Sequence, residues 1–385
     1  MRVRCALATV SLVGLLCHCG GNSAPASSHP DGSTSKDSGS SKPDATHEAA
    51  TESSTPDAGP PASDASDADS DTRDASDASS APDAFDSGPP VPCGSRSGLR
   101  GLTNRTIMVD GKPRTYLIYL PATMDPTAPM PFVFVFHGYM MSGQDMYDIT
   151  QYAAIADAEG IGLAFPNGDQ YPNSLAAPWN IENAGQLVCG DGQYIVGSGD
   201  DFGFIDAMKA DVSADQCLDT KHIFTAGFSM GGYFTHHVGC YRSDMRAIAP
   251  HSGGTLADLS VCTTGHVPVI IFHGTKDSVI DDACDDPTVT PDTGFPASAN
   301  LWATKNGCKT TYTTLPNDSD AGGTGQCYLY DGCPADGQVE ACTFNGMDHC
   351  WAGGATDAGP GASSACPTYA SATQREWSFF KQYAW

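Results

Sequence analysis

Short apolar runs recur along the chain from residue 114 onward, and stretches with helical spacing lie between them. The runs typical of strands are 132–136, 161–165, 221–226, 247–251 and 267–272, with an edge strand at 114–120 and a strand-like segment at 339–344. Helices are expected over 145–158, 204–211, 230–241 and 368–383. This alternation predicts an α/β fold with a mostly parallel, doubly wound sheet flanked by helices.

Residues 1–19 have a different pattern, which is typical of a signal peptide. Arg2 and Arg4 precede an apolar stretch at 6–16 that is too short to span a bilayer. Cys17 and Cys19 are candidates for bacterial lipoprotein processing, although neither follows the usual small residue. The segment predicts an extracellular protein or an outer-surface lipoprotein, whose membrane contact would be the N-terminal lipid alone.

Residues 20–92 are rich in Asp, Ser, Ala and Pro and carry fourteen acidic against three basic side chains. Such a segment cannot bury enough apolar surface to offset its ordering entropy, so it is predicted to be a disordered tether. Residues 93–385 are enough for one domain with a large core. Their thirty-one acidic and fourteen basic residues argue against nucleic acid, anionic membranes and polyanionic substrates, and favour a neutral one.

A candidate nucleophile lies between a predicted strand and a predicted helix, in the run Gly-Phe-Ser-Met-Gly at 227–231. A G-x-S-x-G sequence in that context forms a sharp turn that lifts the hydroxyl of Ser229 out of the sheet. The glycines leave room for the strained backbone. The helix that follows directs its positive end toward this point, and the backbone N–H of Met230 can face a developing oxyanion.

The other members of a catalytic triad follow in the expected chain order of serine, acid and histidine. Asp277 leaves the C-terminal end of the run 267–272, whereas Asp281 and Asp282 lie further from that strand and rank second. Of the eleven histidines, His349 alone follows Asp277. A second oxyanion donor is expected after the strand 132–136, where Gly138 permits a tight turn and the N–H of Tyr139 follows. We interpret the side chain of His137 as structural.

These motifs resemble a family of secreted esterases that contains feruloyl esterases, acetylxylan esterases and extracellular polyhydroxybutyrate depolymerases. The resemblance covers residues 93–385 and rests on His137-Gly138, Trp179-Asn180, the run 200–204, the run 227–232, the run 273–277 and His349-Cys350-Trp351. It implies an α/β-hydrolase fold, hydrolysis of a neutral ester, and no cofactor. The sequence departs from the family at Ala352, where a proline is usual, and at Tyr139, where the depolymerases carry a cysteine, and the latter favours the feruloyl branch.

The function we predict is that of a secreted or surface-tethered, feruloyl-esterase-like enzyme that cleaves acyl esters of xylan. Two other interpretations compete with it. Within the same class of enzyme, the alternative is a polyhydroxybutyrate depolymerase or an acetylxylan esterase. The alternative of another class is an inactive carbohydrate-binding surface protein with the same fold. The intact positions Ser229, Asp277 and His349 argue against that last reading.

Aromatic and acidic side chains near the expected site have open roles. Trp179 and Trp351 are candidates for substrate binding at the rim, where an indole would stack on a sugar or a phenolic group, although tryptophans often serve packing alone. Asp200 and Asp201 precede a predicted helix and either orient the loop above the site or cap that helix, and we favour the cap.

Cysteine usage points to oxidative folding. Twelve of the fifteen cysteines lie in the catalytic region, at positions 93, 189, 217, 240, 262, 284, 308, 327, 333, 342, 350 and 366. An even number in an exported chain predicts disulfides, whose pairing the sequence leaves open. No metal site is predicted, because zinc-type CxxC pairs are lacking and the adjacent His236 and His237 diverge on a helix.

Overall fold

The computed structural model describes residue 93 and the ranges 96–169, 177–181, 196–280, 297–316, 325–355 and 371–385. The chain divides into two units, Met1–Ser80 and Ala81–Trp385, and all described residues belong to the second. The predicted signal peptide and tether lie outside the described residues. Among the helices that are described, none has the length and apolar character needed to cross a membrane.

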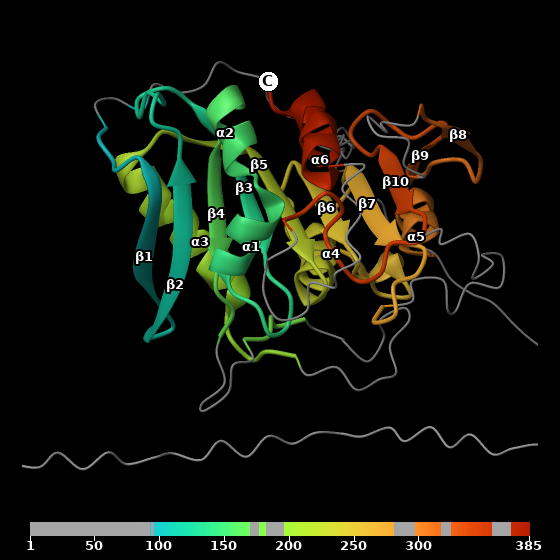
Figure 1. Ribbon diagram of the computed structural model, residues 1–385, viewed down its shortest axis with the longest axis horizontal. Coiled ribbons are helices and arrows are strands. Elements are labelled where there is room, and N and C mark those ends of the chain that lie inside the picture. The colour runs from blue at the N-terminus through green and yellow to red at the C-terminus, as the bar shows by residue number, and fades with distance from the viewer. Residues whose placement is uncertain are drawn as a thin grey trace, which may run out of the picture. The chain divides into compact units, whose positions relative to one another are not determined.

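One sheet of ten strands organises the described part of the chain, in the order β1-β2-β4-β3-β5-β6-β7-β10-β9-β8. The strands are β1 (Gly101–Val109), β2 (Lys112–Leu120), β3 (Met130–Phe136), β4 (Gly162–Pro166), β5 (Leu218–Phe228), β6 (Ala247–His251), β7 (Val269–Gly274), β8 (Tyr312–Thr314), β9 (Gly325–Tyr330) and β10 (Val339–Phe344). The six central strands, β4, β3, β5, β6, β7 and β10, are parallel to one another. The pairs β1–β2 and β2–β4 at one end of the sheet, and β10–β9 and β9–β8 at the other, are antiparallel. The predicted doubly wound, mostly parallel sheet is therefore confirmed (Figure 1).

Helices cover both faces of this sheet. They are α1 (Gly143–Thr150), α2 (Ala153–Glu159), α3 (Asp201–Asp215), α4 (Met230–Tyr241), α5 (Ala297–Lys305) and α6 (Ala372–Phe380). Side chains of α3, α4 and α5 pack on one face and those of α1, α2 and α6 on the other, which is the nearer face in Figure 1. Successive residues of β3 supply the two cores in turn, Phe134 to the first and Val135 to the second.

Several predicted elements differ from those observed. The strand 114–120 is not at the edge, because β1 pairs with it as an outer antiparallel strand. The expected helix 145–158 is two helices, since Gln151 between them has a left-handed φ of 52°. Helix α6 begins after Ser371, whose side chain accepts a hydrogen bond from the N–H of Gln374, and a short 3₁₀ turn at Lys381–Tyr383 follows it; residues 368–370 lie outside the described ranges.

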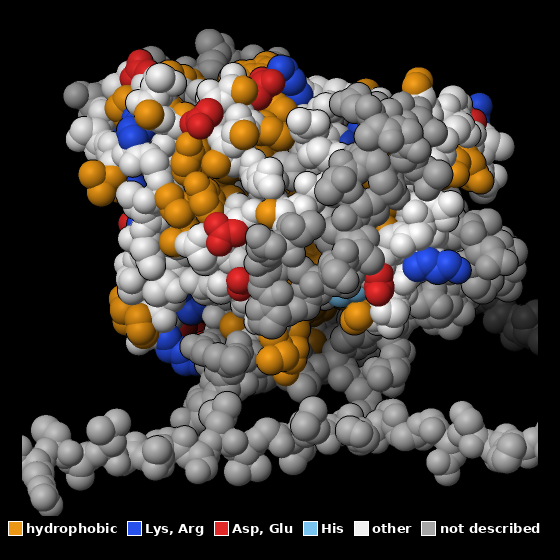
Figure 2. All heavy atoms as spheres, in the orientation of Figure 1, with side chains coloured by type: hydrophobic (Ala, Val, Ile, Leu, Met, Phe, Trp, Pro, Cys, Tyr) orange, Lys and Arg blue, Asp and Glu red, His pale blue; other side chains and the backbone are white. Residues whose placement is uncertain are grey.

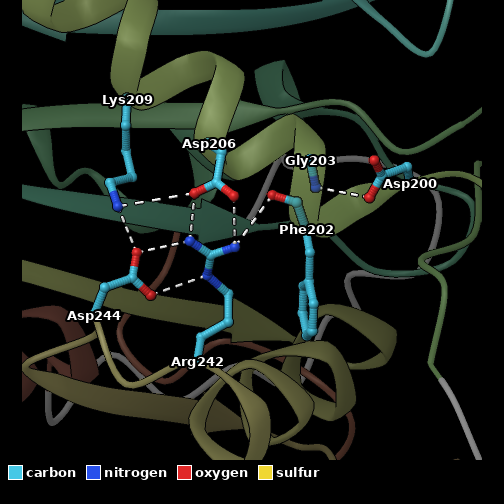
Figure 3. A network of polar contacts seen from close by, with 7 residues as sticks. All are labelled: Asp200, Phe202, Gly203, Asp206, Lys209, Arg242 and Asp244. Atoms are coloured by element: carbon cyan, nitrogen blue, oxygen red, sulfur yellow. Dashed lines mark hydrogen bonds and ion pairs between the residues drawn. The ribbon is translucent and has the colours of Figure 1, made fainter.

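A polar network ties α3 to the C-terminal end of α4 (Figure 3). The guanidinium of Arg242 donates to Asp206 at 2.5 Å, to Asp244 at 2.7 Å and to the carbonyl of Phe202 at 3.3 Å. Lys209 adds an ion pair with Asp244. These contacts hold α3 in position along its axis. Its N-terminal end lies at the edge of the sheet formed by the C-terminal ends of the parallel strands.

Disulfides reinforce the fold, as predicted. The described pairs are Cys93–Cys217, Cys240–Cys262, Cys308–Cys333 and Cys327–Cys342. Cys350 is disulfide-bonded as well, so all nine cysteines in the described ranges are oxidised. The positions 189, 284 and 366 lie outside those ranges.

Candidate active site

Ser229 occupies a strained turn between β5 and α4. Its φ of 56° and ψ of −120° lie outside the regions that non-glycine residues prefer, a conformation that persists only where the surroundings enforce it. A Cβ on Gly227 would lie 2.2 Å from the carbonyl oxygen of Gly231, and one on Gly231 would lie 2.2 Å from that of Phe136. The turn therefore requires glycine at both positions. The N–H of Ser229 donates to the carbonyl of His251 at 2.9 Å, which anchors the turn to β6.

A histidine and a carboxylate meet beside this turn. Nδ1 of His349 lies 2.9 Å and 3.0 Å from the two carboxylate oxygens of Asp277. The ring of His349 packs at 4.8 Å against the ring of Phe228, the residue that precedes Ser229. With Nδ1 held by the carboxylate, Nε2 is the nitrogen left for proton transfer. The competing Asp281 and Asp282 lie outside the described residues.

Asp277 is buried, with 1% of its side chain exposed. Burial alone would raise the pKa of its carboxyl, but the hydrogen bond with His349 and the backbone N–H of Ile280 outweigh it, and the pKa lies below its ordinary value. The carboxyl is therefore ionised at neutral pH and can orient an imidazole and stabilise its charged form.

Asp348 is a second carboxylate at the site, and it was not predicted from the sequence. One of its oxygens accepts from the N–H and hydroxyl of Ser278 and from the N–H of His349. It thereby joins the loop that carries Asp277 to the loop that carries His349. Its position directly before the predicted base was the available signal, but nothing in the chain marks Ser278 as its partner.

His137 braces the loop that follows β3. Its Nδ1 donates to the carbonyl of Gly138 at 2.7 Å, and its Nε2 accepts from the N–H of Gly168 at 2.9 Å. This pattern requires the neutral ring, and burial lowers the pKa of His137 to about 4. The structural interpretation of this side chain is confirmed.

This brace sets the direction of the next peptide group. The carbonyl of Gly138 also accepts from the N–H of Met141, so both donors lie on one side of the loop. In a trans peptide the N–H points opposite to the carbonyl, and the N–H of Tyr139 is directed away from His137. A Cβ on Gly138 would lie 3.3 Å from Cβ of Ser229, which places this loop against the turn that carries Ser229.

The prediction that Trp179 and Trp351 bind substrate is wrong, because the core encloses both rings. Trp179 is 1% exposed, stacks on Phe234 at 5.0 Å and donates its indole N–H to the carbonyl of His137. Trp351 is 2% exposed, and its indole N–H donates to the hydroxyl of Thr373. Each indole has its face packed and its one donor satisfied, so neither presents a stacking surface.

The two acidic residues at the start of α3 have separate roles. Asp200 caps the helix, accepting from the N–H of Gly203 at 2.7 Å (Figure 3), as predicted. Asp201 is not a cap: it is buried, pairs with Arg114 at 2.7 Å and accepts from the N–H of Asn180. The buried ion pair holds the segment 177–181, whose Trp179 in turn supports the His137 loop.

Metal ligation finds little support among the described residues. His236 and His237 are both packed, and Nδ1 of His236 accepts from the indole N–H of Trp302. The one described cluster of ligand-type side chains is Cys327, Glu340 and Cys342. Its two sulfurs form a disulfide and offer no thiolate to a metal.

The strand order and the placement of these loops are those of an α/β-hydrolase fold. The strained serine follows β5 and opens α4, the acid follows β7, and the histidine follows β10 at the same edge of a mostly parallel sheet. Strand order and loop placement thus agree with the fold class that the sequence predicted.

Comparison with known proteins leads from this class to particular enzymes. The chain is 29% identical over 246 residues to feruloyl esterase B of Piromyces equi, covering 61% of this chain and 42% of that protein. It is 29% identical over 231 residues to feruloyl esterase C of Emericella nidulans, covering 57% and 72%. A bifunctional acetylxylan esterase/xylanase of Neocallimastix patriciarum is 28% identical over 171 residues, covering 44% and 22%. The curated relatives are therefore feruloyl esterases and an acetylxylan esterase.

The extent of these similarities differs from one relative to another. The chain spans less than half the length of the Piromyces enzyme and nearly three quarters of the Emericella enzyme. No protein-family model matches the sequence. Among solved structures, an acetyl xylan esterase from Aspergillus awamori aligns with a TM-score of 0.49 at 13% identity, covering 73% of this chain and 99% of that one.

Proposed function

We propose that this protein is a serine carboxylic ester hydrolase in which Ser229, His349 and Asp277 form the catalytic triad. The observation that carries the proposal is the bidentate contact between Asp277 and His349, at 2.9 Å and 3.0 Å, beside a serine held in a strained turn. A buried, ionised carboxylate that orients an imidazole next to such a serine is the arrangement that activates a hydroxyl for acyl transfer.

The proposed reaction has two steps. Nε2 of His349 takes the proton of the Ser229 hydroxyl as its oxygen attacks the ester carbonyl, and the protonated ring then gives that proton to the departing alcohol. Water then attacks the acyl-enzyme and gives a proton to Nε2 of His349. His349 returns this proton to Oγ of Ser229 as the acid is released. Asp277 stabilises the imidazolium in both steps, and the reaction requires no cofactor.

The oxyanion is assigned to two backbone donors. Met230 is the first residue of α4, so its N–H has no acceptor within the helix and lies at the positive end of the helix dipole. The N–H of Tyr139 is directed by the His137 brace, on a loop that lies against Ser229. Each such donor typically accounts for about a hundred- to a thousandfold in rate.

The proposed substrates are acyl esters of xylan, with feruloyl esters first and acetyl esters second. The names of the relatives supply the substrate class. The exposed side chains of Met140 and Val279 support an apolar acyl group, since they follow closely on Tyr139 and Asp277. The acidic chain supports a neutral substrate, and on the face drawn in Figure 2 the described Lys and Arg side chains are scattered.

A panel of methyl ferulate, acetylated xylan and hydroxybutyrate oligomers tests the assignment by kcat/KM. We expect methyl ferulate to be cleaved faster than the hydroxybutyrate oligomers. The reverse order would favour a polyester depolymerase and leave the triad untouched. Ser229→Ala should abolish all hydrolysis with the fold intact, whereas Ser378→Ala, on the exposed side of α6, should have no effect. Near-normal turnover by Ser229→Ala would refute the triad.

The proposed location is outside the cell or on its outer surface. Support comes from the signal-like residues 1–19 and from the disulfides, which form in oxidising compartments. Mass spectrometry of the mature N-terminus distinguishes the two forms. A lipid on Cys17 or Cys19 indicates an anchored protein, and an unmodified terminus downstream of Cys19 indicates free secretion.

A further inference from the structure

His251 joins the nucleophile turn to the loop that carries the base. It is the last residue of β6, and its carbonyl accepts the N–H of Ser229 at 2.9 Å. Its ring lies between two aromatic rings, 4.2 Å from Phe272 and 3.6 Å from Trp351, with interplanar angles of 14° in both stacks. Trp351 is two residues beyond His349, so one residue contacts both halves of the proposed machinery: its backbone carbonyl binds the serine turn and its ring packs on the base loop.

A buried carboxyl group on α6 determines where this ring lies. Nε2 of His251 is 2.8 Å from Oε2 of Glu376, and the exposed fractions of the two side chains are 2% and 0%. Burial raises the pKa of Glu376 well above its ordinary value and lowers that of His251 well below its own. The pair is therefore held together as neutral partners, which avoids an uncompensated buried charge.

Helix α6 also holds the base loop directly. The hydroxyl of Thr373 accepts from the indole of Trp351 and donates to the carbonyl of Thr150, and the N–H of Ala372 donates to the carbonyl of Ala352. Of the serine turn and the base loop, Thr373 and Ala372 thus contact the base loop alone, whereas His251, held by Glu376, contacts both the indole of Trp351 and the serine turn.

We propose that Glu376 is a positioning residue for ester hydrolysis: through His251 it sets the placement of the Ser229 turn relative to the His349 loop. The inference rests on the proposed function for its catalytic consequence. Removing the carboxyl group frees the ring of His251 to rotate between its two stacking partners. Both the peptide that anchors Ser229 and the indole that follows His349 then lose a fixed neighbour, and misplacement of reacting groups is costly to kcat.

Three variants test this inference. Glu376→Leu removes the hydrogen bond, and Glu376→Gln keeps a neutral, isosteric partner for His251. Phe380→Leu is the matched control, because Phe380 lies on the same helix but stacks on Phe224 at 4.7 Å in the core. For each, kcat and KM on 4-nitrophenyl acetate are measured for the folded protein, together with hydrogen exchange of the amides of Ser229, Gly354 and Ala355.

Glu376→Leu is expected to lower kcat about ten- to a hundredfold with KM little changed. It should speed exchange at Ser229, Gly354 and Ala355 about tenfold or more relative to the parent. Glu376→Gln should restore kcat to within about threefold, and Phe380→Leu should lower stability while leaving both readouts unchanged.

Three results would overturn the inference: unchanged kcat and exchange in Glu376→Leu, no better activity in Glu376→Gln than in Glu376→Leu, or equal losses in Phe380→Leu. A parent protein that hydrolyses no ester would instead refute the proposed function. The exchange measurement would then decide the positioning role without any reference to activity.

Discussion

The carboxylate of Asp277 holds Nδ1 of His349 at 2.9 Å, although seventy-two positions separate the two residues in the chain. Their meeting follows from the sheet, because β7 and β10 are parallel neighbours that end in register at Gly274 and Phe344. The N–H of Thr275 donates to the carbonyl of Phe344, and that of Lys276 to the carbonyl of Met347, which joins the two loops before either reaches the site. Backbone contacts thus place Asp277 and His349 together, so the pairing of their side chains costs little further conformational entropy.

Asp277→Asn is expected to lower kcat about a hundred- to ten-thousandfold, with KM nearly unchanged. A neutral amide does not hold the imidazole in the tautomer whose Nε2 can accept a proton. It also does not stabilise the charged form of the imidazole. Asp348→Asn is the matched control, because its carboxylate binds the N–H of His349 and the Ser278 side chain rather than the imidazole; we expect it to cost less than about tenfold. Steady-state kinetics on an aryl ester compares them, and equal losses would show that Asp277 has no special role.

Gly138→Ala should impair the reaction without unfolding the protein. The new Cβ would lie 2.9 Å from Sδ of Met141 and 3.3 Å from Cβ of Ser229. The methionine side chain is flexible and can move, but the strained turn of Ser229 cannot, so the loop after β3 should shift away from Ser229. We expect kcat to fall about ten- to a hundredfold.

Gly265→Ala is the control for that substitution, since a Cβ there would have no heavy atom within 4 Å. It should leave both kcat and the free energy of unfolding unchanged. Wild-type kcat in Gly138→Ala would mean that the loop after β3 does not supply an oxyanion donor.

The fold and the candidate triad were predictable because they depend on local signals. Apolar runs such as 132–136 and 267–272 mark strands, and the residues that follow such strands gather at one edge of a parallel sheet. Ser229 is marked by its G-x-S-x-G motif, Asp277 by its place after a strand, and His349 by being the one histidine after Asp277. Strand β1 was not predicted because its apolar Leu102 and Met108 are exposed, which reverses the expected alternation.

The supporting contacts were not predictable, because they depend on tertiary pairing. Arg114 and Asp201 are eighty-seven positions apart, and His251 and Glu376 one hundred and twenty-five, so nothing local relates them. A glutamate in a helix is ordinarily expected to face water. The prediction that Trp351 lies at the rim is wrong for a similar reason. The sequence shows that position 351 carries an indole, but not whether that indole faces the solvent or the core.

Removal of one disulfide should lower stability and spare catalysis. Cys240–Cys262 closes a loop of sequence separation 22 at the C-terminal end of α4, whereas Ser229 lies at its N-terminal end. The double variant Cys240→Ala/Cys262→Ala should lose about 3 kcal/mol of unfolding free energy through the gain in entropy of the unfolded chain. Urea unfolding measures this, and kcat should remain within about twofold. A large loss of kcat at unchanged stability would contradict the prediction.

Stability should fall in mild acid because buried histidines stay neutral in the folded chain. Burial lowers the pKa of His236 to about 3, against about 6.5 in the unfolded chain. Between those values the unfolded state binds a proton that the native state does not, so the free energy of unfolding falls as pH falls. His236 alone should account for about 2 kcal/mol between pH 7 and pH 5.

His236→Asn isolates this contribution, because the amide oxygen can replace Nδ1 as acceptor for the indole of Trp302 but cannot be protonated in this range. Other buried histidines, such as His137, and the carboxyl of Glu376, whose raised pKa acts in the opposite direction, remain in both proteins and cancel in the comparison. Urea unfolding at pH 7 and pH 5 should show a loss about 2 kcal/mol smaller in the variant than in the parent. An identical loss in the two proteins would mean that His236 takes up its proton equally well in the folded and unfolded chains.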